Sequence, residues 1–197
     1  MVDKAIYEQV HHWMEAHKEN MIHDIQRIVR IPSISNPLEE VKPFGAACRL
    51  AMDEMLQIGR EHGFYTENYG YYVGSIGEKE KNWDDMIGFW NHLDVVPVGE
   101  GWDFDPFGAE LKGDLLIGRG SQDNKGPAIG MLYVMECIRD LKLPVGHQLC
   151  LFVGSDEERG MEDLEYYTKN YPTPALSMIA DCGFPVCYGE KGIIEGK

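Results

Sequence analysis

The chain has 197 residues, 44% of them hydrophobic, which is enough to bury a sizeable core and excludes a wholly disordered protein. Its formal net charge is −15, with 33 acidic residues against 18 basic ones, so its surface repels phosphate backbones and no nucleic-acid partner is expected. No basic and apolar leader opens the sequence and no apolar stretch is long enough to cross a bilayer, so no membrane partner is expected either.

The five cysteines are odd in number and scattered along the chain, and no two of them form a CxxC pair. This pattern indicates small buried thiols in a reducing compartment, so we expect a cytoplasmic protein. The residues concerned are Cys48, Cys137, Cys150, Cys182 and Cys187.

The first half of the chain predicts two helices followed by strands. Apolar residues recur at helical spacing from Ile6 to Ile28, and Pro32 and Pro37 break that helix. We expect helices over residues 4–29 and about 44–62, a strand pair over 65–76, a polar loop over 78–85 and a buried strand over 86–96.

The second half of the chain alternates strands with helices. We expect strands over 115–117, 148–153, 175–180 and 186–194, a helix that begins near Pro127, and a short helix over 161–170. Such alternation predicts an α/β fold, a three-layer sandwich with a mixed, mostly parallel sheet. Ligands of such sheets bind at the carboxyl ends of the strands, where several acids and one histidine of this chain gather.

The first of these groups is His92-Leu-Asp94, at the end of a predicted strand. Residues two apart in a strand point to the same face, so the imidazole and the carboxylate are expected to be neighbours. A metal-bound histidine commonly donates its second N–H to a carboxylate, but a solvated strand end would look the same in the sequence.

The second group surrounds Asp123, in the segment Gly118-Arg-Gly-Ser-Gln-Asp-Asn-Lys-Gly126. Its spacing fits neither a phosphate loop, nor a dinucleotide-binding fingerprint, nor the elbow of a nucleophilic serine. Tight glycine turns could hold the carboxylate of Asp123 between two cations, and a plain helix N-cap is the alternative interpretation.

The third group, Asp156-Glu157-Glu158, follows a predicted strand, and Asp181 ends the next one. Adjacent acids are tolerated when they are solvated, as surface runs are, or when they lie beside cations. A metal hydrolase needs one glutamate to bind metal and another to move protons. The acidic strand ends and the histidine together predict a site for two divalent cations such as zinc, cobalt or manganese, and no HExxH motif is present.

These motifs occur in an order and at a spacing that resemble a known family. They are Asn91-His-Leu-Asp-Val-Val-Pro97, Gly101-Trp102 with Asp105-Pro-Phe107, the segment 118–126, and Ser155-Asp-Glu-Glu158. Together they resemble the zinc-dependent exopeptidase and deacylase family that holds carboxypeptidase G, aminoacylase and succinyl-diaminopimelate desuccinylase. The tail Phe184-Pro-Val-Cys-Tyr-Gly-Glu-Lys-Gly192 looks most similar to its PepV or Xaa-His dipeptidase branch.

The resemblance implies a dinuclear metallopeptidase that hydrolyses the amide bond of a dipeptide or an N-acyl amino acid. Two Zn²⁺ ions would share one water, with Co²⁺ or Mn²⁺ as alternatives. In this resemblance Asp123 bridges the two metals, His92 and Asp181 complete one metal site, and Glu158 serves the other.

The resemblance also implies two catalytic roles. Glu157 corresponds to the general base that takes a proton from the shared water and passes it to the leaving amine. Asp94 corresponds to the acid that orients His92. A cis peptide bond between Asp123 and Asn124 is implied as well.

The sequence departs from the family pattern in two ways. Asn91 stands where the family usually has glycine. Family members are longer, with a lid or dimerisation domain inserted after this region and a later histidine that completes the Glu158 metal site. We therefore expect residues 1–197 to be the N-terminal part of a metallopeptidase catalytic domain, with the lid and the C-terminal part absent. The missing portion of the same enzyme is an expected partner, and the chain alone is expected to be inert or nearly so.

The remaining histidines have no spacing that nominates a substitute ligand, and we interpret them as surface or core residues. They are His11, His12, His17, His23, His62 and His147.

Three alternatives to a dipeptidase remain. One is an N-acyl deacylase such as a succinyl-diaminopimelate desuccinylase, another is a non-catalytic metal-binding module, and the third is an acidic structural domain without metal. The presence of both Glu157 and Asp94 argues against the second, because metal binding alone needs neither a base nor an orienting acid.

Overall fold

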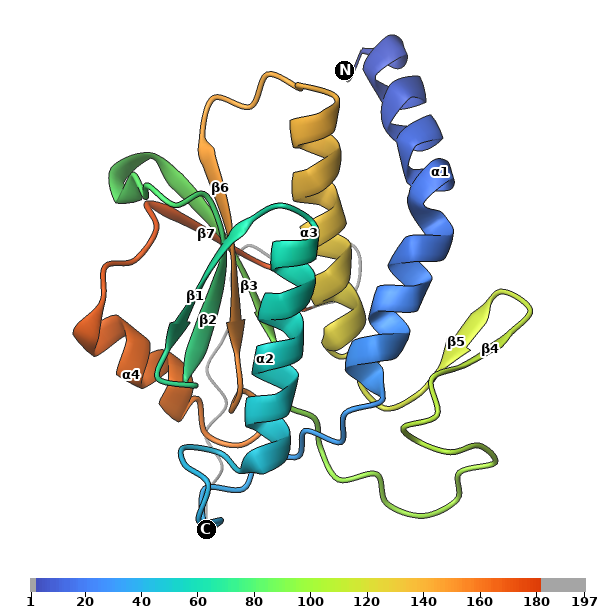
Figure 1. Cartoon of the computed structure of the whole chain (residues 1–197), viewed down its shortest axis with the longest axis vertical. Helices are drawn as coiled ribbons and strands as arrows, with labels where there is room; N and C mark the ends of the chain where they lie inside the picture. The colour runs from blue at the N-terminus through green and yellow to red at the C-terminus, as the bar shows by residue number, and fades with distance from the viewer. Residues whose placement is uncertain (1–2, 182–197) are drawn as a thin grey trace, which may run out of the picture.

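The computed structural model describes residues 3–181, and in its second half strands alternate with helices as the sequence predicts (Figure 1). In chain order they are α1 (Lys4–Val29), α2 (Ala46–Glu61), β1 (Tyr65–Tyr69), β2 (Val73–Gly77), the 3₁₀ turn η1 (Trp83–Asp85), β3 (Met86–His92), β4 (Glu110–Lys112), β5 (Leu115–Ile117), α3 (Lys125–Asp140), β6 (Gln148–Gly154), α4 (Glu162–Asn170) and β7 (Leu176–Ile179). Within that part of the chain, no helix is both long enough and apolar enough to cross a bilayer.

Five of the strands form one mixed sheet in the order β1-β2-β6-β3-β7. Strand β3 is parallel to both of its neighbours, β6 and β7, whereas β2 is antiparallel to β1 and β6. The expected mixed sheet is confirmed, and its parallel part consists of the three strands that lead into the acidic motifs. Because parallel strands end at the same edge, the register that pairs His92 with Gly154 places the ends of β3 and β6 side by side.

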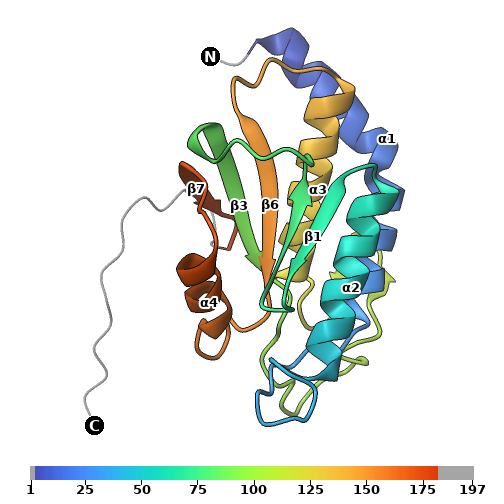
Figure 2. The same ribbon diagram turned by 60° about the vertical axis from the view of Figure 1, so that its left-hand side comes forward.

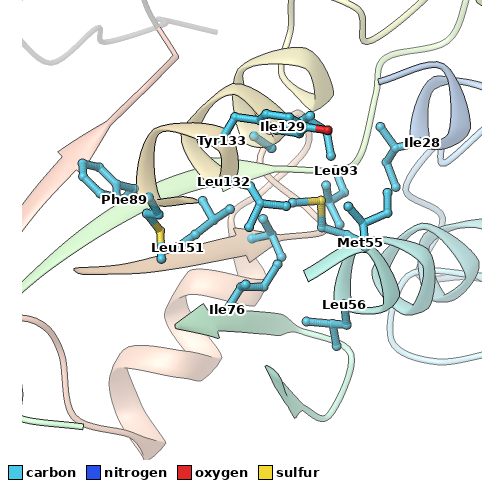
Figure 3. Packing of buried hydrophobic residues seen from close by; sticks show 14 of the residues in the cluster. Ile28, Met55, Leu56, Ile76, Phe89, Leu93, Ile129, Leu132, Tyr133 and Leu151 are labelled. Carbon is cyan, nitrogen blue, oxygen red and sulfur yellow. The ribbon is translucent and has the colours of Figure 1, made fainter. Parts of the chain in front are cut away.

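Helices cover both faces of this sheet, which gives the expected three layers. Figure 2 shows α1, α2 and α3 on one face and α4 on the other. On the three-helix face Met55 of α2, Leu132 of α3 and Leu151 of β6 are fully buried (Figure 3). A second cluster, which includes Phe152 of β6 and Tyr167 of α4, joins α4 to the other face.

The end of β3 differs from the expected strand over 86–96. The strand ends at His92 because the backbone changes partners there. The amide of Leu93 still bonds to the Gly154 carbonyl, but the amide of Val95 bonds to the carbonyl of Ser33, in the segment after α1. The loop that carries Asp94 is therefore held between the sheet and that segment.

Other differences concern short or terminal elements. Strands β4 and β5 form a separate hairpin, of which the sequence predicts the 115–117 strand. Helix α3 begins at Lys125, which places Pro127 in its first turn. The strand predicted over 186–194, Cys182 and Cys187 lie outside the described residues, and the other three cysteines are buried free thiols as predicted.

Candidate metal centre

Three side chains from separate parts of the chain converge at the carboxyl ends of the parallel strands. His92 ends β3, Asp123 lies just before α3, and Asp181 follows β7. The Nε2 atom of His92 lies 3.1 Å from Oδ1 of Asp123 and 3.4 Å from Oδ2 of Asp181. One ligand atom from each residue lies within 4.8 Å of the other two. The structure therefore brings together three of the four residues for which the sequence predicts a metal-binding role.

Glu158, the fourth predicted ligand, lies beside this group rather than in it. Its backbone amide donates to Oδ2 of Asp94 at 3.1 Å. The cluster of converging ligand atoms found among the described residues does not include its carboxylate. Burial is the main cause that raises the pKa of Glu158, and the negative charge of Asp123 adds to it.

Glu157 and Asp94 lie beside different nitrogens of the His92 ring. Oε2 of Glu157 lies 3.8 Å from Nε2 of His92. Nδ1 of His92 lies 3.0 Å from the backbone carbonyl oxygen of Asp94 and 3.4 Å from its carboxylate Oδ1. An Nδ1–H donated to Asp94 leaves Nε2 free to accept a proton or to bind a metal. His92 and Asp94 are neighbours as expected, although Asp94 lies beyond the strand and strand alternation is not the cause.

The negative charges around His92 favour a positive charge at its Nε2 atom. Burial by itself lowers the pKa of His92, but the hydrogen bond to Asp94 and the charges of Asp94, Asp181 and Glu157 raise it to about 9. Burial also raises the pKa of Glu157, and the neighbouring acids add to that effect against the opposing charge of His92. A proton and a divalent cation can each supply the positive charge that this arrangement favours.

The donor set fits a small divalent cation. Zinc binds histidine nitrogen and carboxylate oxygen at about 2.0–2.2 Å, so donors around a tetrahedral ion lie about 3.4 Å apart. The separations of 3.1 and 3.4 Å from Nε2 of His92 are close to that spacing. The side chain of His92 is 3% exposed and that of Asp123 is 64% exposed, so the group opens to solvent at Asp123. Imidazole and carboxylate together suit zinc, cobalt or manganese.

The glycine-rich segment 118–126 folds tightly, as its composition predicts. Gly120 has a φ of 90°, in the left-handed region, and a Cβ at Gly126 would overlap the carbonyl of Ser121. The peptide bond between Asp123 and Asn124 is cis, as the family resemblance implies. Asn124 is the N-cap residue of α3, and its side chain makes no capping hydrogen bond. The interpretation of Asp123 as a plain N-cap is therefore wrong.

Two asparagines contribute to the site in a way that the motifs do not reveal. Nδ2 of Asn124 donates to Oδ1 of Asp181 at 2.5 Å and to the carbonyl of Ala180 at 2.9 Å. Nδ2 of Asn91 donates to Oδ1 of Asn124 and to the same carbonyl of Ala180. These bonds join β3, the start of α3 and the end of β7, so they position Asp181 opposite His92. The signal in the sequence is Asn91 itself, a polar residue inside an apolar strand.

The surroundings of the group include a cavity of about 260 Å³, lined by His92, Glu157 and Asp181 and by apolar side chains such as Trp90 and Ile179. The other histidines take no part in the cluster of ligand atoms found within residues 3–181. His62, for example, lies among the helices, and the interpretation of these histidines as surface or core residues agrees with their positions.

Comparison with known proteins supports the family resemblance. A profile described as Peptidase family M20/M25/M40 matches residues 88–185, which include every predicted site residue. The chain is 36% identical over 182 residues to "Putative dipeptidase YtjP" of Bacillus subtilis (strain 168), a match that covers 91% of this chain and 39% of that protein. It is 34% identical over 186 residues to "Putative dipeptidase SH1171" of Staphylococcus haemolyticus (strain JCSC1435), covering 92% of this chain and 39% of that protein. The chain thus spans about two fifths of the length of these curated relatives.

Solved structures agree on the fold. Human carnosine dipeptidase 1 matches with a TM-score of 0.75 at 20% identity, over 90% of this chain and 41% of that chain. The di-peptidase Dug1p of Saccharomyces cerevisiae matches with a TM-score of 0.67 at 17% identity, over 83% of this chain and 39% of that chain. At these identities the likeness concerns the fold alone. The matches to the family profile and to the curated relatives show that this chain belongs to Peptidase family M20/M25/M40.

Proposed function

We propose that this chain carries part of the active site of a dinuclear zinc enzyme that hydrolyses the peptide bond of dipeptides. The convergence of His92, Asp123 and Asp181 carries the proposal, because it joins ligand atoms from three separate segments of the chain. Both curated relatives described above are named as putative dipeptidases, which favours a dipeptide substrate. An N-acyl amino acid presents the same kind of amide bond and is the alternative substrate.

The proposed metal ligands are the three carboxylates and the one imidazole that the sequence nominates. Asp123 would be shared by two zinc ions, His92 and Asp181 would complete one site, and Glu158 would serve the other. When bound, the cations supply Lewis acidity, which lowers the pKa of water toward neutrality and polarises a substrate carbonyl. Cobalt or manganese would supply the same chemistry.

Glu157 is the proposed general base. Its carboxylate lies 3.8 Å from Nε2 of His92. Burial raises the pKa of Glu157, which brings it closer to the working pH and so favours both uptake and release of a proton. It would take a proton from the attacking water and hand it to the leaving amine. Asp94 would hold Nδ1 of His92 and so keep Nε2 directed at Asp123 and Asp181.

We propose further that residues 1–197 form the N-terminal part of the catalytic domain and that a later portion of the same enzyme completes it. Within residues 3–181 the cluster supplies three ligands to one metal and leaves Glu158 outside. The later portion, with its lid or dimerisation domain, would provide the remaining ligand of the Glu158 metal. The chain alone should therefore bind metal weakly and hydrolyse dipeptides slowly or not at all.

Zinc binding by this chain tests the proposed centre. In calorimetric titration the wild type should bind zinc, and Asp123→Asn should weaken binding by more than about 10-fold, because it removes a ligand charge from the cluster. Asp114→Asn makes the same change in charge in the turn between β4 and β5 and should bind zinc as the wild type does. Equal zinc affinity in all three proteins would contradict the proposed centre.

Hydrolysis assays then separate an enzyme from a metal-binding module. This chain, and a form extended to the length of its relatives, would be offered dipeptides and N-acyl amino acids with zinc, cobalt or manganese. We expect the extended form to hydrolyse dipeptides. Hydrolysis confined to N-acyl amino acids would identify a deacylase, and metal binding without any hydrolysis would favour a non-catalytic module. Full activity of residues 1–197 would contradict the proposal that a later portion of the enzyme completes the site.

A further inference from the structure

The turn that follows β6, residues 155–158, carries both site glutamates, and we call it the glutamate turn. The amides of Glu157 and Glu158 donate to the two carboxylate oxygens of Asp94, at 3.2 and 3.1 Å. Asp94 is fully buried, and it also faces Nδ1 of His92. One carboxylate thus holds the second half of the glutamate turn and aligns the histidine.

The first half of the glutamate turn is held by a different carboxylate. The amides of Ser155 and Asp156 donate to Oδ2 of Asp163, at 2.7 and 3.0 Å. Asp163 lies in the first turn of α4 and is 3% exposed, and its Oδ1 accepts the amide of Leu164 at 2.7 Å. All four amides of the glutamate turn are therefore accepted by two buried carboxylates.

The strand before the turn leaves room for the carboxylate of Asp163. A Cβ added at Gly154 would overlap Oδ2 of Asp163. Gly154 is also the residue of β6 that pairs with His92 of β3. The carboxylate of Asp163 consequently lies against the strand end that faces the histidine, and glycine at position 154 is what permits this close approach.

We propose that Asp163 is a positioning residue for Glu157 and Glu158. This inference rests on the proposed function, because that function gives the two glutamates their roles. Asp163 fixes the entry to the glutamate turn and Asp94 fixes its exit, so the backbone that carries both glutamates is held from two sides. Charged acceptors make strong hydrogen bonds to backbone amides, and a supporting shell of this kind limits how far the glutamates can move.

Residue-resolved hydrogen exchange on this chain tests the positioning. Asp163→Ala should accelerate exchange of the amides of residues 155 and 156 by about 10- to 100-fold, as expected for the loss of bonds to a charged acceptor. Gly154→Ala should act in the same direction, because its Cβ displaces the carboxylate. Asp163→Asn keeps one acceptor oxygen and should give an intermediate change. Glu165→Gln makes the same change in charge on the same helix and should leave these amides unchanged.

Two further readouts separate positioning from a general loss of stability. Exchange in the middle of β6 should stay as in the wild type, which shows that the variants remain folded. In the extended form, Asp163→Ala should lower kcat by up to about 100-fold with little change in KM, and Asp163→Asn should recover part of the loss. Unchanged exchange at residues 155 and 156, or an unchanged kcat, would overturn the proposal. Asp123→Asn should weaken zinc binding by more than about 10-fold without altering exchange in the glutamate turn, so failure of the proposed function remains distinguishable.

Discussion

His62 connects two helices and should make the stability of the chain depend on pH. Its Nε2 lies 2.9 Å from Oδ2 of Asp24 in α1, and its Nδ1 lies 2.6 Å from Oε2 of Glu136 in α3. A protonated imidazole donates to both carboxylates, whereas a neutral one donates to a single partner. The hydrogen bonds to Asp24 and Glu136, opposed by burial, raise the pKa of His62 from its ordinary value of 6.5 to about 9.

The size of the contribution of His62 to the free energy of unfolding follows from this shift in pKa. At about 1.36 kcal/mol for each pKa unit, protonated His62 contributes up to about 3 kcal/mol to the free energy of unfolding. The folded chain holds the proton more tightly than the unfolded one, so the contribution is complete below pH 6.5 and disappears as the pH rises through about 9. The free energy of unfolding should therefore fall across that interval.

Urea unfolding of the wild type and of His62→Gln, with a chelator present, measures the effect. At about pH 6 the wild type should be more stable by up to about 3 kcal/mol, and at about pH 9.5 the difference should nearly vanish. His92 titrates in the same direction, so the difference between the two proteins is needed to isolate His62. The control His147→Gln removes an exposed imidazole paired with Asp85 and should change stability by less than about 0.5 kcal/mol. A difference between wild type and His62→Gln that does not vary with pH would refute the reasoning.

Three further changes test the site and its support. Glu157→Ala should abolish hydrolysis in the active form while calorimetry still detects zinc binding, and retained turnover would refute its role as the base. Asn124→Ala removes a donor to Asp181 and should weaken zinc binding by about 10-fold or more, and an unchanged affinity would show that Asp181 is held without it. Lys125→Met removes the bond that Nζ donates at 2.6 Å to the buried carbonyl of Ile31, which then keeps the amide of Ser33 as a donor. It should lower the free energy of unfolding in urea by about 1–3 kcal/mol, and an unchanged midpoint would contradict this.

The long elements could be predicted from the sequence because their periodicity is strong. The helix expected over residues 4–29 matches α1, and the strand expected over 148–153 matches β6 to within one residue. Short elements such as β4 carry too few residues to show a period, and the end of β3 depends on a change of partner from Gly154 to Ser33. Such a change is a tertiary event, and no local pattern records it.

The candidate site could be predicted in part because strand ends are visible in the sequence and parallel strands end together. The separate roles of its acids could not be predicted, because each role depends on which groups the carboxylate contacts in the folded chain. Asp123 and Asp181 face Nε2 of His92, whereas Asp94 and Asp163 accept backbone amides of the glutamate turn. In the sequence all four are aspartates near strand or helix ends. The acidic excess of this chain therefore has at least two structural uses, one that favours a cation and one that holds the loop beside it, and composition alone reveals neither.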